Sequence, residues 1–162
     1  MPTSLLRTNK EVAEIYNRQA DTVYRVCFLF MKNRQDAEDM VQNTFLRLMS
    51  RNPHFENAGH EKAWLITTAS NLCRDSLRHW WHRTVGIDDA EASEAPPFSI
   101  DETLQKVLDL PANYRTALYL RYYEGYSGAE ISRMLHRSES TVRGWLHTGR
   151  NLLKLELISE EA

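Results

Sequence analysis

Residues 84–100 interrupt the chain with a stretch that shows no helical or strand periodicity, and this interruption limits what the chain can fold into. The segment reads TVGIDDAEASEAPPFSI, and its Pro-Pro pair, small residues and carboxylates predict a flexible acidic linker. A length of 162 residues allows either one compact domain or two small ones. The position of the interruption favours two small domains on a tether.

The distribution of charged residues also divides the chain into two bodies and a linker. Residues 1–83 carry 12 basic and 9 acidic side chains, and residues 111–157 carry seven basic and four acidic ones. Residues 84–110 carry one basic and seven acidic side chains. Two mildly basic bodies are therefore joined by an acidic strip. A basic face suits a polyanionic partner such as nucleic acid, although so small an excess is a weak signal by itself.

Helical periodicity fills both bodies, so we expect an all-α fold of two small helical domains. The predicted helices span residues 11–31, 36–49 and 61–82 in the first body, with a loop at 52–60, and continue from 101 to 157 in the second. We see no alternating strand pattern and no internal repeat. The first helix places one set of residues on a single face: Val12, Ile15, Tyr16, Val23, Val26, Cys27 and Phe30.

Composition and the N-terminal sequence indicate where the protein is located and the state of its cysteines. Hydrophobic residues make up 42% of the chain, yet no apolar run approaches the ~20 residues that a membrane span requires. The first residues, MPTSLLRTNKEV, lack the apolar segment of a secretion signal, so we expect a cytoplasmic protein without membrane insertion. Cys27 and Cys73 lie in apolar helical surroundings, which predicts buried free thiols rather than a disulfide or ligand pair.

Residues 128–150, GAEISRMLHRSESTVRGWLHTGR, contain two short helical patterns broken at His136-Arg137-Ser138. Ser138 suits the N-cap of the second helix, and His136 would adopt a left-handed conformation at the corner. The pattern predicts a helix-turn-helix whose second helix enters the major groove, with an ordinary helical hairpin as the alternative. Apolar positions turn inward: Ile131, Leu135, Val142, Leu146, Gly149 and Leu153. Polar or small positions turn outward, with Arg150 at their edge: Ser140, Arg143, Gly144, His147 and Asn151.

Residues 36–49, DAEDMVQNTFLRLM, form an amphipathic helix with an unusual outer face. The predicted inner residues are Ala37, Val41, Thr44, Phe45 and Leu48. Opposite them lie Asp39, Gln42 and Leu46, with Met49 nearby. A leucine that points away from the core beside a carboxylate and an amide suggests a protein-contact stripe, and a lone exposed leucine is the alternative. The carboxylates do not predict a metal site, because no histidine lies at ligand spacing on this helix.

The third predicted helix ends in RDSLRHWWHR, residues 74–83, where aromatic and cationic side chains alternate. Rings stack on unpaired bases while cations hold the backbone, so this composition suits single-stranded nucleic acid. The alternative is that Trp80 and Trp81 seal the end of the bundle, one of them buried and the other half-exposed. The histidines and Cys73 match no common zinc spacing, so we expect no metal.

Four stretches together resemble a bacterial sigma factor of the extracytoplasmic-function (ECF) type. They are DAEDMVQNTFLRLM, AWLITTASNLCRDSLR, LPANYRTALYLRYYEGYSGAEIS and SESTVRGWLHTGR, in the family's order and at its usual separations. The resemblance implies that residues 8–83 form sigma region 2, that 84–102 form an acidic linker, and that 103–157 form sigma region 4. It also implies a non-enzymatic protein without cofactor or small-molecule substrate. The implied partners are RNA polymerase core, through its clamp helices and flap, promoter DNA, and an anti-sigma factor.

The resemblance also assigns residues to three surfaces. The polymerase-binding residues it implies are Asp39, Gln42, Phe45, Leu46 and Met49. The implied minus-ten residues, which open the duplex and capture a flipped base together with loop 54–60, are His60, Trp64, Asn71, Arg74 and Arg78. The implied minus-thirty-five residues are Glu139, Ser140, Thr141, Arg143, Gly144, His147 and Arg150. Three positions where many relatives carry arginine differ here: Thr67, Trp145 and Thr148.

Two other functions fit parts of the sequence. A stand-alone helix-turn-helix regulator would use residues 1–83 as a sensor or dimerisation domain and would act as a homodimer on a palindromic site. A small helical metal-dependent hydrolase would use the Asp, Glu and His side chains. Size measurement tests the first alternative, and a metal assay tests the second.

Overall fold

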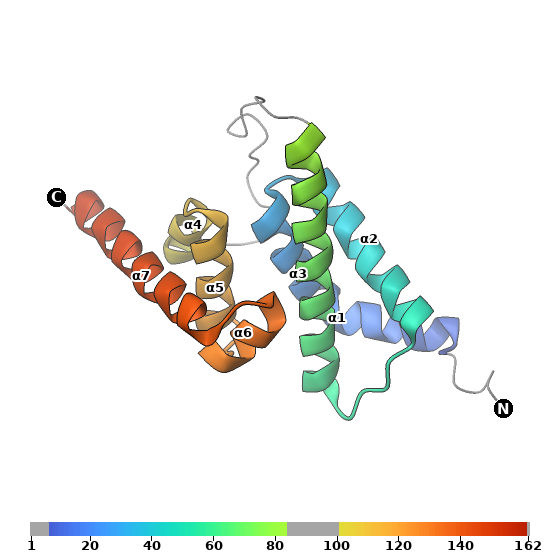
Figure 1. The fold of residues 1–162 in the computed structure, drawn as a ribbon. Coiled ribbons are helices and arrows are strands. Elements are labelled where there is room, and N and C mark those ends of the chain that lie inside the picture. The colour runs from blue at the N-terminus through green and yellow to red at the C-terminus, as the bar shows by residue number, and fades with distance from the viewer. Residues whose placement is uncertain (1–6, 84–100, 162) are drawn as a thin grey trace. The chain divides into compact units, whose positions relative to one another are not determined.

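The computed structural model describes residues 7–83 and 101–161, which fall into two compact units on either side of the intervening segment. Every regular element in these residues is an α-helix, which confirms the predicted all-α class (Figure 1). The predicted linker at 84–100 lies outside the described residues. The two units are described separately below.

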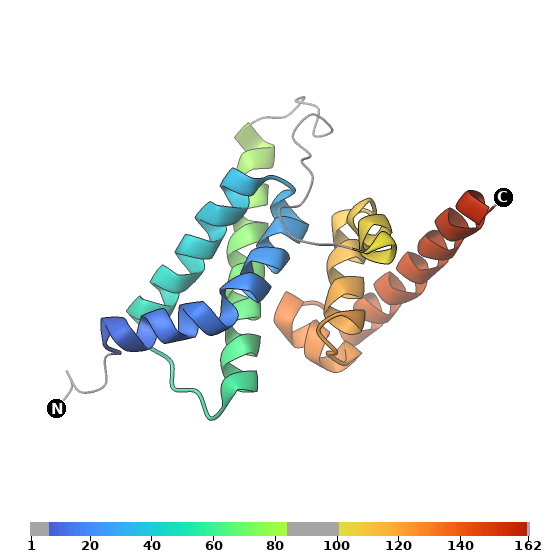
Figure 2. The same cartoon turned by 180° about the vertical axis from the view of Figure 1, so that it is seen from behind.

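The first unit is a bundle of α1 (Asn9–Met31), α2 (Arg34–Arg51) and α3 (Ala58–Arg83). Each of these helices packs against the other two (Figures 1 and 2). Apolar residues from all three helices fill the core and are fully buried: Val26, Ala37, Leu48, Leu65, Ile66 and Ala69. The predicted inner face of the second helix is confirmed, because each of its five residues is buried.

The prediction that Cys27 and Cys73 are buried free thiols is also confirmed. Cys27 of α1 and Cys73 of α3 are both buried and free. A hydrogen bond with the Cys27 thiol, together with burial, holds the pKa of Cys73 well above its usual value. The Cys73 thiol therefore stays protonated and unreactive inside the core at neutral pH.

Side-chain caps explain why two helices begin earlier than the periodicity indicates. The Asn33 side chain accepts a hydrogen bond from the Asp36 amide at 2.8 Å, so α2 begins at Arg34 rather than at Asp36. Asn57 Oδ1 accepts from the His60 amide at 2.8 Å, so α3 begins before Glu61. His60 therefore lies in the first turn of α3 and not in the preceding loop.

The second unit contains α4 (Glu102–Leu108), α5 (Ala112–Tyr122), α6 (Gly128–Leu135) and α7 (Glu139–Glu161). Helix α5 packs against the other three helices, and α6 and α4 also contact α7. The core is formed mainly by aliphatic residues: Leu104, Val107, Leu118, Leu120, Ile131, Leu135, Val142 and Leu146. Arg115 is buried among them and donates to the Leu110 carbonyl at 3.0 Å, and burial lowers its pKa to about 10.

The corner between α6 and α7 has the predicted geometry. Ser127 and Glu130 form a capping box at the start of α6, and the helix ends at His136, which has φ 53° and ψ 48°. The left-handed conformation expected for His136 is thus confirmed. Ser138 Oγ accepts from the Thr141 amide at 3.1 Å and caps the first turn of α7. The two helices and their short turn form a helix-turn-helix.

Candidate protein and nucleic-acid interfaces

The outer face of α2 carries an exposed apolar stripe. Leu46 is 59% exposed and Met49 is 47% exposed, and both Asp39 and Gln42 are exposed near them. Phe45 differs from the other four residues assigned to this surface, because only 6% of it is exposed. In the free protein Phe45 belongs to the core beneath the stripe and is not part of the accessible surface.

Tyr16 of α1 extends this apolar surface and was missed as a surface residue. The periodicity of α1 places Tyr16 on the inner face, but the structure leaves 47% of it exposed, so this expectation was wrong. The Tyr16 ring packs on the Phe45 ring with centroids 4.9 Å apart and planes tilted by 58°. Tyr16 therefore contacts the residue of α2 that lies beneath the stripe.

The predicted minus-ten residues share one face of α3. At ~100° per residue, His60, Trp64, Asn71, Arg74 and Arg78 fall within about 80° of one another. His60 and Arg78 are exposed, and the other three are half-buried. This face presents aromatic, amide and cationic groups together, which is the composition that binds unpaired nucleotides.

Hydrogen bonds within α3 fix parts of this face. Asn71 Oδ1 accepts from Arg74 Nη2 at 3.0 Å, so the Asn71 carbonyl is engaged and its amide nitrogen is oriented by the pair. Arg78 forms an ion pair with Asp75. Both members of that pair are exposed, so the bond is weak and a phosphate can replace the carboxylate. The side chains of Trp80 and Trp81 lie outside the described residues.

Phe55 of the loop before α3 and Arg7 of the N-terminal segment add an aromatic ring and a cation that were not singled out from the sequence. Phe55 meets the ring of His60 edge-on at a centroid distance of 5.5 Å and the ring of Trp64 at 5.9 Å. The Arg7 guanidinium lies over the Phe55 ring, with Cζ 4.9 Å from the centroid. Arg7 and Phe55 are 48 positions apart, so no local pattern indicates their contact.

An ionic cluster with a buried carboxylate and an exposed arginine joins α1 to the start of α3. Glu61 is 6% exposed, and its carboxylate accepts from Arg18 Nε at 3.1 Å, Arg18 Nη2 at 2.9 Å and Gln19 Nε2 at 3.0 Å. Burial by itself raises the pKa of Glu61, but the hydrogen bonds from Arg18 and Gln19 outweigh it and the pKa is lowered. Glu61 therefore remains ionised and fixes the first turn of α3 against α1.

The second helix of the helix-turn-helix presents a small and polar outer face. Ser140, Arg143, Gly144 and His147 are exposed, Glu139 before them is exposed too, and Thr141 is half-buried. Val142 and Leu146 on the opposite side are buried. Among the described residues, no atom apart from the adjoining backbone of α7 and the two neighbouring residues lies within 4 Å of the position that a Cβ on Gly144 would occupy. The middle of this face is therefore flat and open to another molecule.

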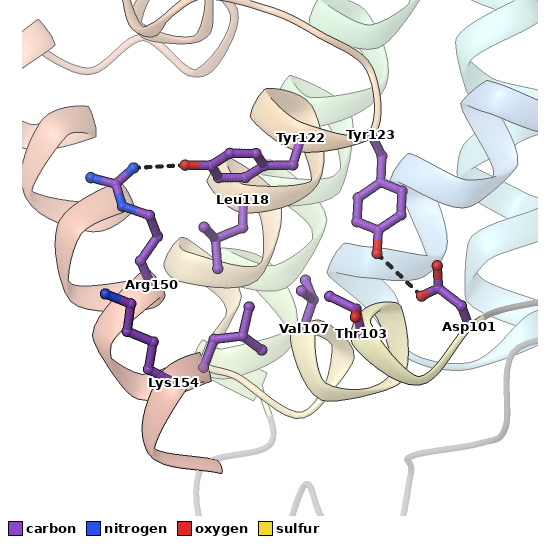
Figure 3. Close-up of a pocket in the computed structure, with 9 residues that line it drawn as sticks. Asp101, Thr103, Val107, Leu118, Tyr122, Tyr123, Arg150 and Lys154 are labelled. Atoms are coloured by element: carbon purple, nitrogen blue, oxygen red, sulfur yellow. Dashed lines mark hydrogen bonds between the residues drawn. The ribbon is translucent and has the colours of Figure 1, made fainter. Parts of the chain in front are cut away.

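Arg150 is oriented differently from the outward-facing residues of α7. Its Nη1 donates to the Tyr122 hydroxyl at 2.9 Å, which directs the guanidinium toward α5 (Figure 3). Arg150 is half-buried in this arrangement. It is placed at the edge of the polar face, as predicted, but its described contact is with the protein.

Arg150 also lines a groove of about 470 Å³ between α4, α5 and α7 (Figure 3). Val107, Leu118 and Leu153 contribute apolar surface to it. The exposed Tyr122 and Tyr123 rings stand beside it, and the Tyr123 hydroxyl donates to Asp101 at 3.2 Å. The groove offers an apolar site flanked by aromatic rings, which is typical of protein docking surfaces.

None of the helices in residues 7–83 and 101–161 is long and apolar enough to cross a membrane. Within the same residues, no three His, Cys, Asp or Glu side chains lie close enough together to hold a metal ion.

A helix-turn-helix with an open polar face in one unit, together with an exposed apolar stripe and a face of aromatic, amide and cationic side chains in the other, fits a helical DNA-binding protein that also docks on another protein. Comparison with known families agrees with this class. Residues 15–83 match Sigma-70 region 2, and residues 100–153 match Sigma-70 region 4. The ECF RNA polymerase sigma factor SigM of Bacillus subtilis is 32% identical over 154 residues, which cover 88% of this chain and 93% of SigM.

Two further sigma factors are similar to this chain. The ECF sigma factor SigW of Bacillus subtilis is 28% identical over 164 residues, covering 90% of this chain and 88% of SigW. The solved structure of the sigma factor RpoE of Bartonella quintana, in complex with the anti-sigma factor NepR, superposes with a TM-score of 0.67. Its sequence is 21% identical and the match covers 91% of this chain and 94% of RpoE, which shows a shared fold.

The chain belongs to the ECF group of the sigma-70 family. It binds RNA polymerase core and directs transcription initiation at specific promoters. The stand-alone regulator is not favoured, because the region that it would use for sensing or dimerisation matches Sigma-70 region 2.

Proposed function

We propose that the two units divide the work of promoter recognition. Residues 8–83 bind polymerase core and open the minus-ten element, and residues 103–157 recognise the minus-thirty-five element. The acidic segment at 84–102 joins them and passes through polymerase channels that otherwise hold nucleic acid, where its negative charge substitutes for a polyanion. Polymerase carries out all the chemistry, so the protein itself is not an enzyme and acts in the cytoplasm.

The observation that carries this proposal is the open outer face of α7. Gly144 leaves room for a DNA backbone, Arg143 can donate to the O6 and N7 atoms of guanine, and Ser140 and His147 can reach bases or phosphates. We assign Glu139 and Thr141 to the same surface, at the first turn of the helix. Arg150 joins them if phosphate displaces its bond to Tyr122.

In the first unit, the exposed stripe on α2 supports docking on the clamp helices of polymerase. Leu46 and Met49 supply apolar area, and Asp39 and Gln42 supply polar contacts at its edge. Phe45 supports this surface from below. We assign the flap contact to the groove between α4, α5 and α7, because apolar side chains and two exposed tyrosines line it.

An anti-sigma factor is a further proposed partner. The relative of known structure is held by one, and the stripe and groove of this chain are surfaces that such a protein could cover. Covering them would block polymerase binding without any change in the fold.

Association with polymerase tests the proposal. Each basic unit has an excess of only three positive charges, so few counterions are released and the free protein binds DNA weakly. Light scattering should therefore show that the protein forms no homodimer on DNA. In size-exclusion chromatography the protein should co-elute with polymerase core. Tight, sequence-specific binding of a homodimer to a palindromic site would contradict the proposal and support the stand-alone regulator.

A further inference from the structure

Arg7, which precedes α1, holds the loop that leads into α3. Its Nη1 donates to Asn52 Oδ1 at 2.8 Å, its Nη2 donates to the Pro53 carbonyl, and its guanidinium lies over the Phe55 ring. One side chain thus makes three different contacts with a loop that lies 45 or more residues away in sequence. A planar guanidinium is suited to this combination, because it donates in a fork and also stacks on rings.

The Arg7 contacts continue into the candidate minus-ten face. The Phe55 ring that stacks on Arg7 meets His60 and Trp64 at its edges. A displacement of Phe55 would therefore also release the two rings of α3 that are closest to the loop. Asn52, at the start of the loop, adopts a left-handed conformation with φ 44°, which asparagine tolerates better than most residues, and its side chain is held by Arg7.

The other end of the loop is held separately. Gln19 Nε2 donates to the Ala58 carbonyl at 3.4 Å and to Glu61, which also binds Arg18. Residues 53–57 are thus fixed at both ends by side chains from the N-terminal part of the first unit. The interior of the loop is left exposed, with Glu56 and Asn57 open to solvent.

We propose that Arg7 is a positioning residue for minus-ten recognition: it holds Phe55 against His60 and Trp64 so that the loop is already shaped to receive an unpaired base. The inference rests on the proposed function of this loop and adds a residue outside the α3 face. A preorganised loop binds more tightly because it loses less conformational freedom on binding. Base selection also depends on the pocket shape, so loss of Arg7 should reduce both affinity and discrimination.

The test uses polymerase holoenzyme assembled with wild-type protein, Arg7→Ala, Arg7→Lys or Lys10→Ala. Lys10 is an exposed cation in the first turn of α1, so Lys10→Ala removes the same charge three residues along the sequence. The probe is a fluorescein-labelled single strand that carries the minus-ten sequence of a promoter that the holoenzyme transcribes. A second strand has one minus-ten base replaced, and anisotropy gives the dissociation constant for each.

We expect Arg7→Ala to weaken binding of the correct strand about tenfold and to reduce the preference over the substituted strand, with unchanged affinity for core polymerase. Lysine keeps the charge but cannot form the fork or stack equally well, so Arg7→Lys should recover only part of the loss. Lys10→Ala should behave as wild type. A shift in affinity without a change in preference would mean a general electrostatic contact and would overturn the proposal.

Three other results would also overturn it: full rescue by lysine, an equal loss in Lys10→Ala, or loss of core binding in Arg7→Ala. If wild-type holoenzyme transcribes no promoter, the proposed function itself fails. If wild-type holoenzyme is active and Arg7→Ala matches it in affinity and preference, only the assignment of Arg7 fails.

Discussion

Gly149 of α7 lies directly against Leu118 of α5, and a Cβ at position 149 would come within 2.9 Å of Leu118 Cδ1. Leu118 is buried, so it cannot move away without disturbing the core. Gly144, little more than one turn earlier in the same helix, has open space where a Cβ would be. The two glycines of α7 therefore serve different purposes, one allowing helices to pack and the other leaving the outer face flat.

This difference predicts opposite effects of the same substitution. Gly144→Ala should stabilise the second unit by about 0.5–1 kcal/mol, because alanine is a better helix former, yet lower transcription if DNA approaches the backbone there. Gly149→Ala should destabilise the unit by about 1–3 kcal/mol through overpacking. Thermal unfolding and promoter-directed transcription measure the two effects. A Gly144→Ala protein that is stabilised and fully active would argue against close contact at this face.

Arg143→Ala should reduce promoter use without affecting core binding. Loss of a bidentate contact with a guanine costs about 1–3 kcal/mol and relaxes selection at one base position. Arg121→Ala provides the control, since Arg121 is an exposed arginine on α5 that is not on the outer face of α7. Transcription from a set of single-base promoter variants would reveal the change. An unchanged pattern of promoter choice in Arg143→Ala would remove Arg143 from the recognition surface.

Leu46→Asp should prevent association with polymerase core and leave the fold intact. Leu46 is 59% exposed, so the substitution should change the free energy of unfolding by less than about 0.5 kcal/mol. A charge at the centre of an apolar contact costs at least about 2 kcal/mol, or roughly thirtyfold in affinity. Circular dichroism and co-purification with core measure the two quantities. Asn17→Asp adds the same charge at an exposed position of α1 and serves as the control. Co-purification of Leu46→Asp with core at wild-type yield would mean that the stripe is misassigned.

The Glu61 cluster predicts a specific dependence of stability on pH. The folded-state pKa of Glu61 is lowered, since the hydrogen bonds from Arg18 and Gln19 outweigh burial, which acts in the opposite direction. Its stabilising contribution is therefore complete above the unfolded-state pKa of about 4.3 and is lost as pH falls through the folded-state value. Hydrogen exchange in α1 and α3 should show this loss in the wild-type protein.

Glu61→Gln should remove that acid-dependent component and cost about 1–3 kcal/mol at neutral pH, because a buried carboxylate that accepts from Arg18 and Gln19 is replaced. Glu38→Gln, which changes an exposed carboxylate of α2, should leave the acid profile close to that of the wild type. Identical acid profiles for Glu61→Gln and wild type would show that the cluster contributes no pH-dependent stability.

The local features of this fold were predictable because they follow from neighbouring residues. The α6–α7 corner depends on Ser138 as a cap and His136 as a left-handed end, and both are visible in the sequence. The exposed Leu46 follows from the helical period of α2 alone. Such signals are complete within one or two turns of helix.

Features that depend on distant residues were not predictable in this way. Tyr16 has inner-face periodicity, yet it is half-exposed and packs on Phe45 of another helix. Arg150 turns toward Tyr122 of α5, and Arg7 reaches Phe55 across the first unit. Each of these contacts joins elements whose packing fixes the distance, and no local pattern encodes it.

In-vitro transcription tests the central claim most directly. Purified protein would be added to RNA polymerase core with DNA fragments taken from upstream of the protein's own gene. We predict a transcript with a defined start that requires both core and protein, is absent with Leu46→Asp, and is weakened with Arg143→Ala. Transcription no greater than that of core alone, on these fragments and on a wider library of promoter fragments, would contradict the account.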